Sequence, residues 1–495
     1  MTSGNAAGAF HSALGPSAHL GPRQSREDRV LNAAIRYPRR RRTRGALRSP
    51  AIATLLAAAF AATPAGASAA SAAPSAAPAS FAANCGTKPI TMQGYFETGF
   101  PGTVDLTKLF TKQHPNVKWK VREDPFAVIT QDAPLVLSSP NPPDLMRTPQ
   151  ITGLVKDHVL LNLDRYYKIF GWNKFPASDL EQLRVAPSGR PQGVGPVWAM
   201  GINYSMTGVF YNKALAAKIS MKSPPATLAQ LDADMAKAKA AGILPVEQFD
   251  SAGNGGLIFP LQFLMADYTI AASGSVQPIN AWVLDQPHAT VVTHANLLAV
   301  EHLDQWIKDG YFNPDANAVS YSTMMARFDH GQGLFIFDGD WESGGFDHNY
   351  PGKYGFFLFP PLKAGGKQAA MSAPLTYGIP ATAKHASCAA YFLNWVQTNA
   401  AARALNVAVY GSNPGGPASL PIPPVKPGTV TAQTLAAGKL IAKENGAMGF
   451  IANATGPIDA EAWTPAVQRL FGGQISPESV LKTVQADYEQ ELSAP

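Results

Sequence analysis

Residues 337–345, FDGDWESGG, place three carboxylates around one tryptophan. Asp338, Asp340 and Glu342 flank Trp341, and two glycines follow. Three kinds of chemistry use such residues. Paired carboxylates serve as the acid and base of a hydrolase, carboxylates ligate hard metal ions, and an indole stacks on a polar ligand whose hydroxyls donate to the acids. The surrounding sequence has to distinguish these three.

Metal and cofactor motifs are absent from the sequence. It contains no G-x-S-x-G, H-E-x-x-H, G-x-G-x-x-G, Walker or C-x-x-C pattern. A calcium loop starting at Asp338 would need glycine where Ser343 stands and glutamate where Asn349 stands. The sequence therefore predicts no metal site and no cofactor. A hydrolase using Asp338 or Asp340 together with Glu97 remains the enzymatic alternative, because spacing in sequence does not give the separation of two carboxyls in space.

The first 84 residues have the order of an export signal. A basic cluster at 36–48 (RYPRRRRTRGALR) precedes the apolar run AIATLLAAAFAA at 51–62 and a small-residue stretch. That run is too short and too rich in alanine to span a bilayer. Residues 68–84 are mostly Ala, Ser and Pro and carry no charge, which is typical of an extended tether. We expect an exported protein, extracellular or at the cell surface, with 1–84 as signal peptide and tether.

The net charge of the remaining chain excludes a nucleic-acid partner. Ten of the 40 basic residues but only two of the 34 acidic residues lie in 1–84, which leaves 30 basic and 32 acidic residues. No basic patch remains that could neutralise phosphates.

The two cysteines carry separate predictions. Cys388 falls on the apolar face of HASCAAYFLNWVQT, which predicts a helix with a buried, inert thiol. Cys85 lies at the boundary between the expected leader and the folded part of the chain. One alternative for this cysteine is that it carries a lipid as the first residue of the mature protein.

Strand-like and helical patterns alternate along the body, which predicts an α/β fold. Strands are expected at 90–96 and 117–121 with a helix at 103–115 between them. Amphipathic helices are expected at 227–241 and 294–309, each followed by a glycine stop. The length from Cys85 to Pro495 predicts two domains.

The order of several local patterns resembles one family across 89–495. They are NPPDLM (141–146), HVLLNLDRY (158–166), TGVFYNKAL (207–215), PPATLAQL leading to AAGILPV (224–246), KDGYFNP (308–314), FDHGQGLFIFDGDW (328–341), FPPLKAGG (359–366) and ADYEQEL (486–492). In this combination, residues 89–495 are similar to the family 1 extracellular solute-binding proteins of ABC importers, which include the maltodextrin-binding proteins.

This resemblance implies a two-lobed, periplasmic-binding-protein-like α/β fold with a hinge and an interlobe cleft. Lobe one would comprise 89–202 plus 377–425, and lobe two 204–371 plus 430–495. The chain would capture a carbohydrate, do no chemistry, act as a monomer and deliver the solute to membrane permease subunits. A binding protein for a non-sugar solute, such as an anion met by Arg147, is a further alternative.

The resemblance also implies which residues contact the solute. Trp341 matches the family's stacking tryptophan, Asp340 lies beside it, and Trp463 matches a late aromatic platform. Tryptophans on periodic helix faces, Trp306 and Trp395, are expected in the core instead. The other expected ligand-binding residues are Glu97, Thr148, Gln150, Tyr204, Asn254 and Tyr377.

Overall fold

The computed structural model describes residues 80–251 and 255–493, and these residues form one compact unit. Most of the expected leader lies outside the described residues. Within the described part of the chain, no helix is both long and apolar enough to cross a membrane.

One eight-stranded mixed sheet organises the fold. Its main path runs β2-β1-β3-β9-β6-β7, with β10 added beside β9 and β8 beside β6. β1 pairs in parallel with β2 and β3, whereas β9 and β6 pair antiparallel to each other. The strands are β1 (Ile90–Glu97), β2 (Val117–Asp124), β3 (Leu145–Arg147), β6 (Ala199–Asn212), β7 (Phe335–Gly339), β8 (Tyr354–Phe357), β9 (Ala370–Gly378) and β10 (Ala447–Met448), and β4 (Arg184–Val185) and β5 (Gln192–Val197) form a separate hairpin.

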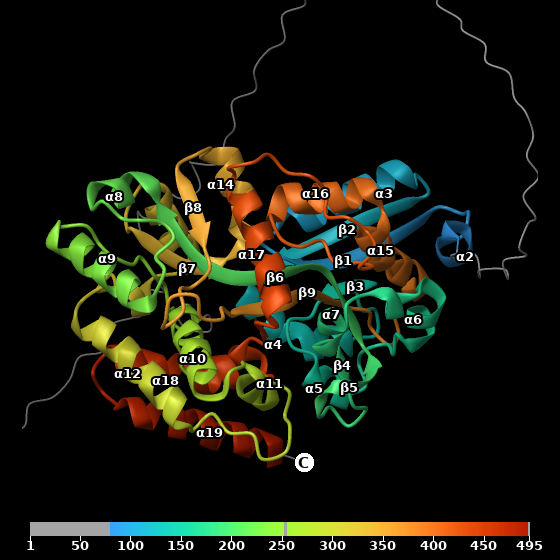
Figure 1. Cartoon of the computed structure of the whole chain (residues 1–495). Helices are drawn as coiled ribbons and strands as arrows, with labels where there is room; N and C mark the ends of the chain where they lie inside the picture. The colour runs from blue at the N-terminus through green and yellow to red at the C-terminus, as the bar shows by residue number, and fades with distance from the viewer. Residues whose placement is uncertain (1–79, 252–254, 494–495) are drawn as a thin grey trace, which may run out of the picture. The chain divides into compact units, whose positions relative to one another are not determined.

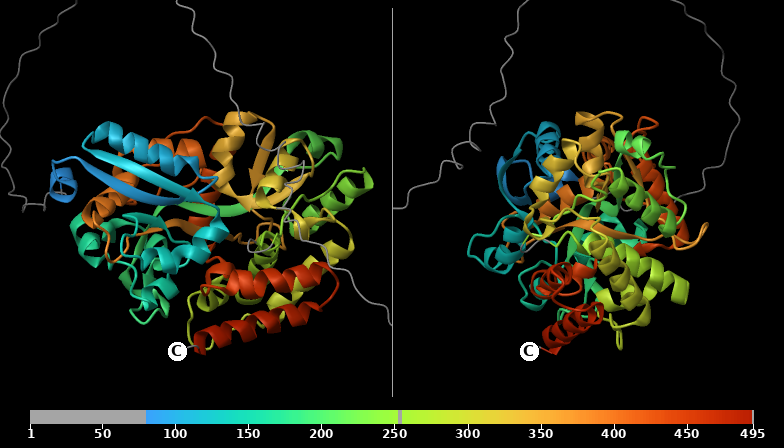
Figure 2. Two further views of the ribbon diagram at one scale, coloured as in Figure 1. Left: turned by 180° about the vertical axis from the view of Figure 1, so that it is seen from behind. Right: turned by 90° about the vertical axis from the view of Figure 1, so that its left-hand side faces the viewer.

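Helices surround this sheet on either side of the long strand β6, drawn green in Figures 1 and 2. The helices on the same side of β6 as β1 and β2 are α2 (Phe81–Cys85), α3 (Pro101–Gln113), α4 (Phe126–Leu137), α5 (Thr152–Lys156), α6 (Asp164–Phe170), α7 (Ala177–Glu181), α15 (Ala386–Thr398) and α16 (Ala400–Tyr410). The others are α8 (Lys213–Lys218), α9 (Leu228–Ala240), α10 (Ile258–Ser273), α11 (Gln277–Val283), α12 (His294–Lys308), α13 (Tyr321–Asp329), α14 (Ser343–Asn349), α17 (Val430–Glu444), α18 (Thr464–Phe471) and α19 (Pro477–Ser493).

Local sequence signals explain where the expected helices begin and end. The Thr227 hydroxyl accepts from the backbone N–H of Gln230 at the start of α9, and Thr293 caps α12 through Asn296 in the same way. Gly242 and Gly310, beyond the two helices, have positive φ values of 71° and 62°. The strand and helix predictions for these regions are confirmed, with ends that differ by a few residues.

Buried apolar side chains form two separate clusters. The first cluster draws on residues from Cys85 to Ile202 and from Leu375 to Tyr410. The second cluster draws on residues from Met206 to Met371 and from Val430 to Tyr488. Two strands run from one cluster to the other, because β6 contributes Ile202 to the first and Met206 to the second, and β9 contributes Leu375 and Met371. β6 and β9 are therefore two continuous strands that link the clusters, and residues 411–429 link them a third time, between Tyr410 and Val430.

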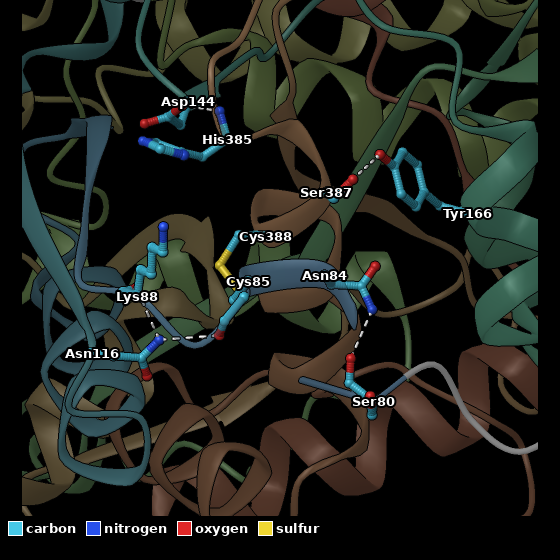
Figure 3. Close-up of a disulfide and its surroundings, with 11 residues drawn as sticks. Ser80, Asn84, Cys85, Lys88, Asn116, Asp144, Tyr166, His385, Ser387 and Cys388 are labelled. Carbon is cyan, nitrogen blue, oxygen red and sulfur yellow. Dashed lines mark hydrogen bonds between the residues drawn. A yellow bond between two sulfur atoms is a disulfide. The ribbon is translucent and has the colours of Figure 1, made fainter. Parts of the chain in front are cut away.

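A disulfide joins Cys85 of α2 to Cys388 of α15, with an S–S distance of 2.00 Å (Figure 3). The prediction of a free, inert thiol at Cys388 is therefore wrong, although its burial at 1% exposure is as expected. Lipid attachment at Cys85 needs the same Sγ atom that the disulfide uses, so this structure is incompatible with that alternative. Helical spacing showed that Cys388 is buried but could not show which residue faces it.

The fold also begins earlier than the sequence predicts. Ser80 caps α2, and Phe81, which packs against the first cluster, stacks on His114 at a centroid separation of 4.0 Å. The last residues of the expected tether are thus packed helix, held by an aromatic contact and by the disulfide that follows.

Candidate functional site

A cavity of about 540 Å³ lies where the two clusters meet. The first cluster's side supplies Glu97, Phe100, Phe126 and Arg147, and strand β9 supplies Met371, Ala373, Pro374 and Leu375. The second cluster's side is richer in rings. We call its five residues, Phe249, Phe259, Tyr321, Trp341 and Phe450, the aromatic wall. A concave site with many apolar rings and a few polar groups suits a small organic ligand.

Trp341 is positioned at the end of β7 and takes part in both clusters. Its partly buried indole packs against apolar residues of each one. The ring lies directly over Gly339, where a Cβ atom would overlap the indole carbons. This close approach explains the glycine two positions before the tryptophan in GDW. The structure thus places Trp341 at the cavity, as the resemblance predicts.

The other rings of the aromatic wall continue from Trp341. Phe259 lies 6.2 Å from Trp341 between ring centroids and is stacked on Phe450 at 5.7 Å. Phe249 meets Tyr321 edge to face at 5.1 Å. These rings come from three separate parts of the chain, so one face of the cavity offers a broad apolar surface.

Two acids of the opening motif lie behind the aromatic wall around the Tyr321 hydroxyl. The Tyr321 oxygen is 2.9 Å from Asp338 Oδ2 and 2.6 Å from Glu342 Oε1, and it accepts the Trp341 Nε1–H at 2.9 Å. Burial raises the pKa of Asp338 well above its usual value and the Glu342 charge raises it further. Burial also raises the pKa of Glu342 to about 6. Asp338 is fully buried and does not line the cavity, whereas Glu342 does.

Asp340 points away from the cavity. Its Oδ1 accepts the Ser412 hydroxyl at 2.7 Å, and it also accepts hydrogen bonds from Ser205 and the Met206 backbone. Burial raises its pKa to about 7. The structure therefore gives Asp340 a link between β7, β6 and the segment after α16, and does not bring it to the cavity lining.

Glu97 and Arg147 form an ion pair on the opposite side of the cavity. Arg147 donates Nε to Glu97 Oε2 at 3.0 Å and Nη1 to the Thr376 carbonyl at 3.2 Å. Burial raises the pKa of Glu97, and Arg147 opposes that shift. Both residues line the cavity. The charges compensate each other, so this side offers hydrogen-bonding groups with little net charge.

The loop after β3 contributes less than expected. Thr148 is fully buried and its hydroxyl has no hydrogen-bond partner among the described residues. Gln150 is partly buried and donates Nε2 to the Ala452 carbonyl at 3.1 Å. Neither lines the cavity, whereas Pro149 between them does.

The two tyrosines expected at the crossovers do not line the cavity. Tyr377 on β9 is fully buried and its hydroxyl lies 3.1 Å from the Thr103 hydroxyl. Tyr204 on β6 is 6% exposed, donates its backbone N–H to the Asn413 carbonyl, and has a hydroxyl without a partner among the described residues. Both lie on the strands that connect the clusters, and neither reaches the cavity.

Trp463 does not stand at the cavity. It is fully buried in the second cluster, edge to face with Trp282 at 5.9 Å. The resemblance led to the expectation of a platform, but Trp463 ends a π-helical turn (Asp459–Trp463) that carries its ring inward. Trp306 and Trp395 are core residues as predicted, at 1% and 4% exposure. Asn254 lies outside the described residues.

Several cavity residues had no signal in the sequence. Phe249, Phe259 and Phe450 sit among other apolar residues, where a core ring and a cavity ring look alike. Asp459 opens the π-helical turn, lines the cavity and accepts the Thr464 hydroxyl at 3.0 Å. Burial raises its pKa to about 7. Within the described ranges, no group of three or more His, Cys, Asp or Glu could hold a metal ion.

Comparisons with known proteins agree with this architecture. Residues 89–403 match the sequence model of a family described as bacterial extracellular solute-binding protein. A search among curated proteins found no match.

Solved structures of similar fold are numerous. A chitin oligosaccharide binding protein is 18% identical with a TM-score of 0.66, and the match covers 82% of this chain and all of that one. The ABC substrate-binding protein Lmo0181 from Listeria monocytogenes, in complex with cycloalternan, is 16% identical with a TM-score of 0.64, covering 82% and 100%. Maltose-bound MalE3 of T. maritima is 14% identical with a TM-score of 0.62, covering 81% and 99%. At these identities the likeness shows the fold, which is the two-lobed periplasmic-binding-protein type.

Proposed function

Because this chain belongs to the bacterial extracellular solute-binding protein family, we propose that it captures a carbohydrate in the cavity and delivers it to an ABC importer. The single observation that carries the proposal is the lining of the cavity. The aromatic wall faces the Glu97–Arg147 pair across the space where the two clusters meet. A sugar has apolar C–H faces that cover rings and hydroxyls that need donors and acceptors, so this combination fits both of its surfaces.

We assign the two lobes to the two hydrophobic clusters. Lobe one would be 89–202 plus 377–425 and lobe two 204–371 plus 430–495, with β6 and β9 as the hinge. The change of cluster along β6 and β9 supports these crossovers. Solute that touches both sides would favour closure, because only a difference in affinity between open and closed states moves that equilibrium.

The class of solute follows from the lining. The similar structures named above bind a chitin oligosaccharide, cycloalternan and maltose, which are carbohydrates. Compensation of Arg147 by Glu97 argues against an anionic solute, since no uncompensated cation lines the cavity among the described residues. A neutral sugar or oligosaccharide is the solute we favour.

The protein's partners and location follow from its family. An extracellular solute-binding protein is exported, and the segment 1–84 would supply its signal. We propose a monomer that meets the permease subunits at the outer face of the membrane. Cell fractionation with intact-mass measurement tests export. Full-length chain in the cytoplasm with residues 1–60 retained would contradict it.

A secreted carbohydrate hydrolase is the competing function. It would need Asp338 or Asp340 to reach a glycosidic bond together with Glu97. Both aspartates are buried, at 0% and 2% exposure, and neither lines the cavity. Glu97 is held by Arg147. The geometry therefore favours binding without turnover.

A thermal-shift screen with product analysis tests the proposal. Maltotriose, raffinose and chitotriose would each be mixed with purified protein, and the melting temperature and the sugar would both be measured. We expect at least one sugar to raise the melting temperature and to be recovered intact. Shortened sugar in the same samples would support the hydrolase, and no shift with any carbohydrate of a wider panel would contradict sugar binding.

A further inference from the structure

The hydrogen bonds around the Tyr321 oxygen require a proton that the ordinary charge states do not supply. Three groups lie within hydrogen-bond distance of this oxygen: Asp338 Oδ2, Glu342 Oε1 and the indole N–H of Trp341. A tyrosine hydroxyl has one hydrogen to donate. The indole N–H can only donate, so it uses the oxygen as an acceptor.

Proton counting then fixes the state of the two acids. The Tyr321 O–H donates to one carboxylate, and the other carboxyl must itself carry a proton to approach the same oxygen as a donor. Two ionised carboxylates around one hydroxyl would leave one of them facing a lone pair. These three distances are all satisfied as hydrogen bonds when Asp338 and Glu342 share one proton in addition to the tyrosine hydrogen.

Among the described residues, no basic side chain replaces this proton. The charged neighbours that act on the pair are themselves acids, Asp340 on Asp338 and Asp329 on Glu342. On the helices packed nearby, Arg327 of α13 is paired with Glu247 and Asp315.

The remaining nearby charges are also engaged elsewhere. Arg403 of α16 donates to the Gln397 carbonyl, and Asp347 of α14 accepts from the backbone of α17. On β6, Ser205 is bonded to Asp340. Across the cavity, Arg147 is held by Glu97. The shared proton is therefore the compensating positive charge of this site.

We propose that Tyr321 is a positioning residue for solute capture: with one proton shared between Asp338 and Glu342, it holds the Trp341 indole against the cavity, and loss of that proton releases the indole. This inference rests on the proposed function. Glu342 is the group expected to leave when the proton is lost, because it is partly exposed at the cavity whereas Asp338 is buried. The raised pKa of both acids agrees with a proton retained near neutral pH, and the two acids titrate as a pair.

Fluorine NMR of the free protein tests the positioning role without any sugar. All eight tryptophans would be replaced by 5-fluorotryptophan, and Trp341→Phe would assign the Trp341 resonance. We expect this resonance to move as the pH is raised from neutral to alkaline values, because the indole N–H loses its fixed acceptor geometry when the shared proton is lost. Maltotriose, raffinose or chitotriose, whichever binds, should bind about tenfold more weakly at the upper end.

Two variants separate positioning from folding. Glu342→Gln supplies an amide N–H in place of the shared proton, so its Trp341 resonance should stay at the low-pH position throughout the titration. Tyr321→Phe removes the common oxygen, so the resonance should be displaced and should no longer titrate. Tyr268→Phe is the matched control, because its hydroxyl contacts His302 and lies outside the cavity lining.

The outcomes are distinct. A wild-type Trp341 resonance that does not move with pH, or a Glu342→Gln protein that titrates like wild type, would overturn the proposal. Normal titration of the resonance with no sugar bound at any pH would leave the positioning role standing and refute the proposed function instead.

Discussion

Gln150 and Ala452 join the two sides of the cavity. The Gln150 Nε2 donates to the Ala452 carbonyl oxygen at 3.1 Å, from the loop after β3 to the segment after β10. Ala452 belongs to the second cluster, whereas Gln150 follows a strand of the first. If the lobes open about β6 and β9, this hydrogen bond has to break. It is therefore a contact that favours the closed arrangement.

Removing this contact should favour the open protein. We expect Gln150→Ala to weaken sugar binding by about three- to tenfold, since a neutral hydrogen bond contributes roughly 0.5–1.5 kcal/mol. The melting temperature should stay close to that of wild type. Titration calorimetry checks the affinity, with Gln277→Ala on the exposed start of α11 as the control. If Gln150→Ala and Gln277→Ala bind the sugar with equal affinity, the hydrogen bond from Gln150 does not contribute to closure.

Trp341 and Trp463 should respond to truncation in opposite ways. Trp341→Ala removes a stacking surface, so affinity should fall by about one to two orders of magnitude, as expected for a loss of roughly 1–3 kcal/mol. Trp463→Ala empties a fully buried site and should lower the free energy of unfolding by about 3–5 kcal/mol. Denaturant unfolding and calorimetry on both variants check the contrast. A large stability loss with unchanged affinity for Trp341→Ala would place that residue in the core.

Stability should fall as pH rises, because several buried carboxyls prefer to be protonated. Burial raises the pKa of Asp267 to about 8, and its Oδ2 has no hydrogen-bond partner among the described residues. The folded state then holds a proton that the unfolded chain releases near pH 4. Its contribution is complete below that value and is lost as pH rises toward 8. Asp315 does not offset this, since Arg327 lowers its pKa to about 2 and its contribution is already complete.

Melting temperatures across this pH range test the sign. We expect wild type to melt at a lower temperature at pH 8 than at about pH 5, and Asp267→Asn to reduce that difference by a few degrees. Asp157→Asn, an exposed acid, should leave the difference unchanged. A wild-type melting temperature that rises with pH would contradict the assignment.

The disulfide should be present in the exported protein and should stabilise it. Cys85 and Cys388 are separated by 303 residues, so the bond closes a long loop of the unfolded chain, and its loss should cost about 2–5 kcal/mol. Mass spectrometry of the intact protein should find no alkylated cysteine until a reductant is added, and Cys388→Ser should melt at a lower temperature. A lipid-modified Cys85 in the mature protein would contradict the disulfide directly.

The sequence predicts the elements of this fold better than the site. Capping residues and apolar periodicity are local, so α9 and α12 lie where the sequence predicts them, and each ends shortly before its glycine, Gly242 or Gly310. The resemblance predicted a cavity position for Trp341 through the motif GDW. The glycine of this motif, Gly339, has a structural reason, because a Cβ atom there would overlap the indole. The sequence did not predict that Trp463 is a core residue. The direction of its ring depends on the π-helical turn that Trp463 ends, and the resemblance did not indicate this turn.

Other parts of the site depend on contacts between distant segments. The aromatic wall collects rings from residues 249 to 450, and nothing in their local patterns marks them as cavity residues. The pairing of Cys85 with Cys388 and the three contacts at the Tyr321 oxygen have the same origin. Such relationships arise only when the chain is folded.

Small-angle scattering with and without saturating sugar tests the central claim most directly, namely that one solute is held between two lobes joined by β6 and β9. The sugar identified in the thermal-shift screen would be used, and the same sample would be checked for sugar breakdown. We predict a smaller radius of gyration in the presence of the sugar, with the sugar recovered intact. An unchanged radius of gyration with the sugar tightly bound would contradict capture by closure.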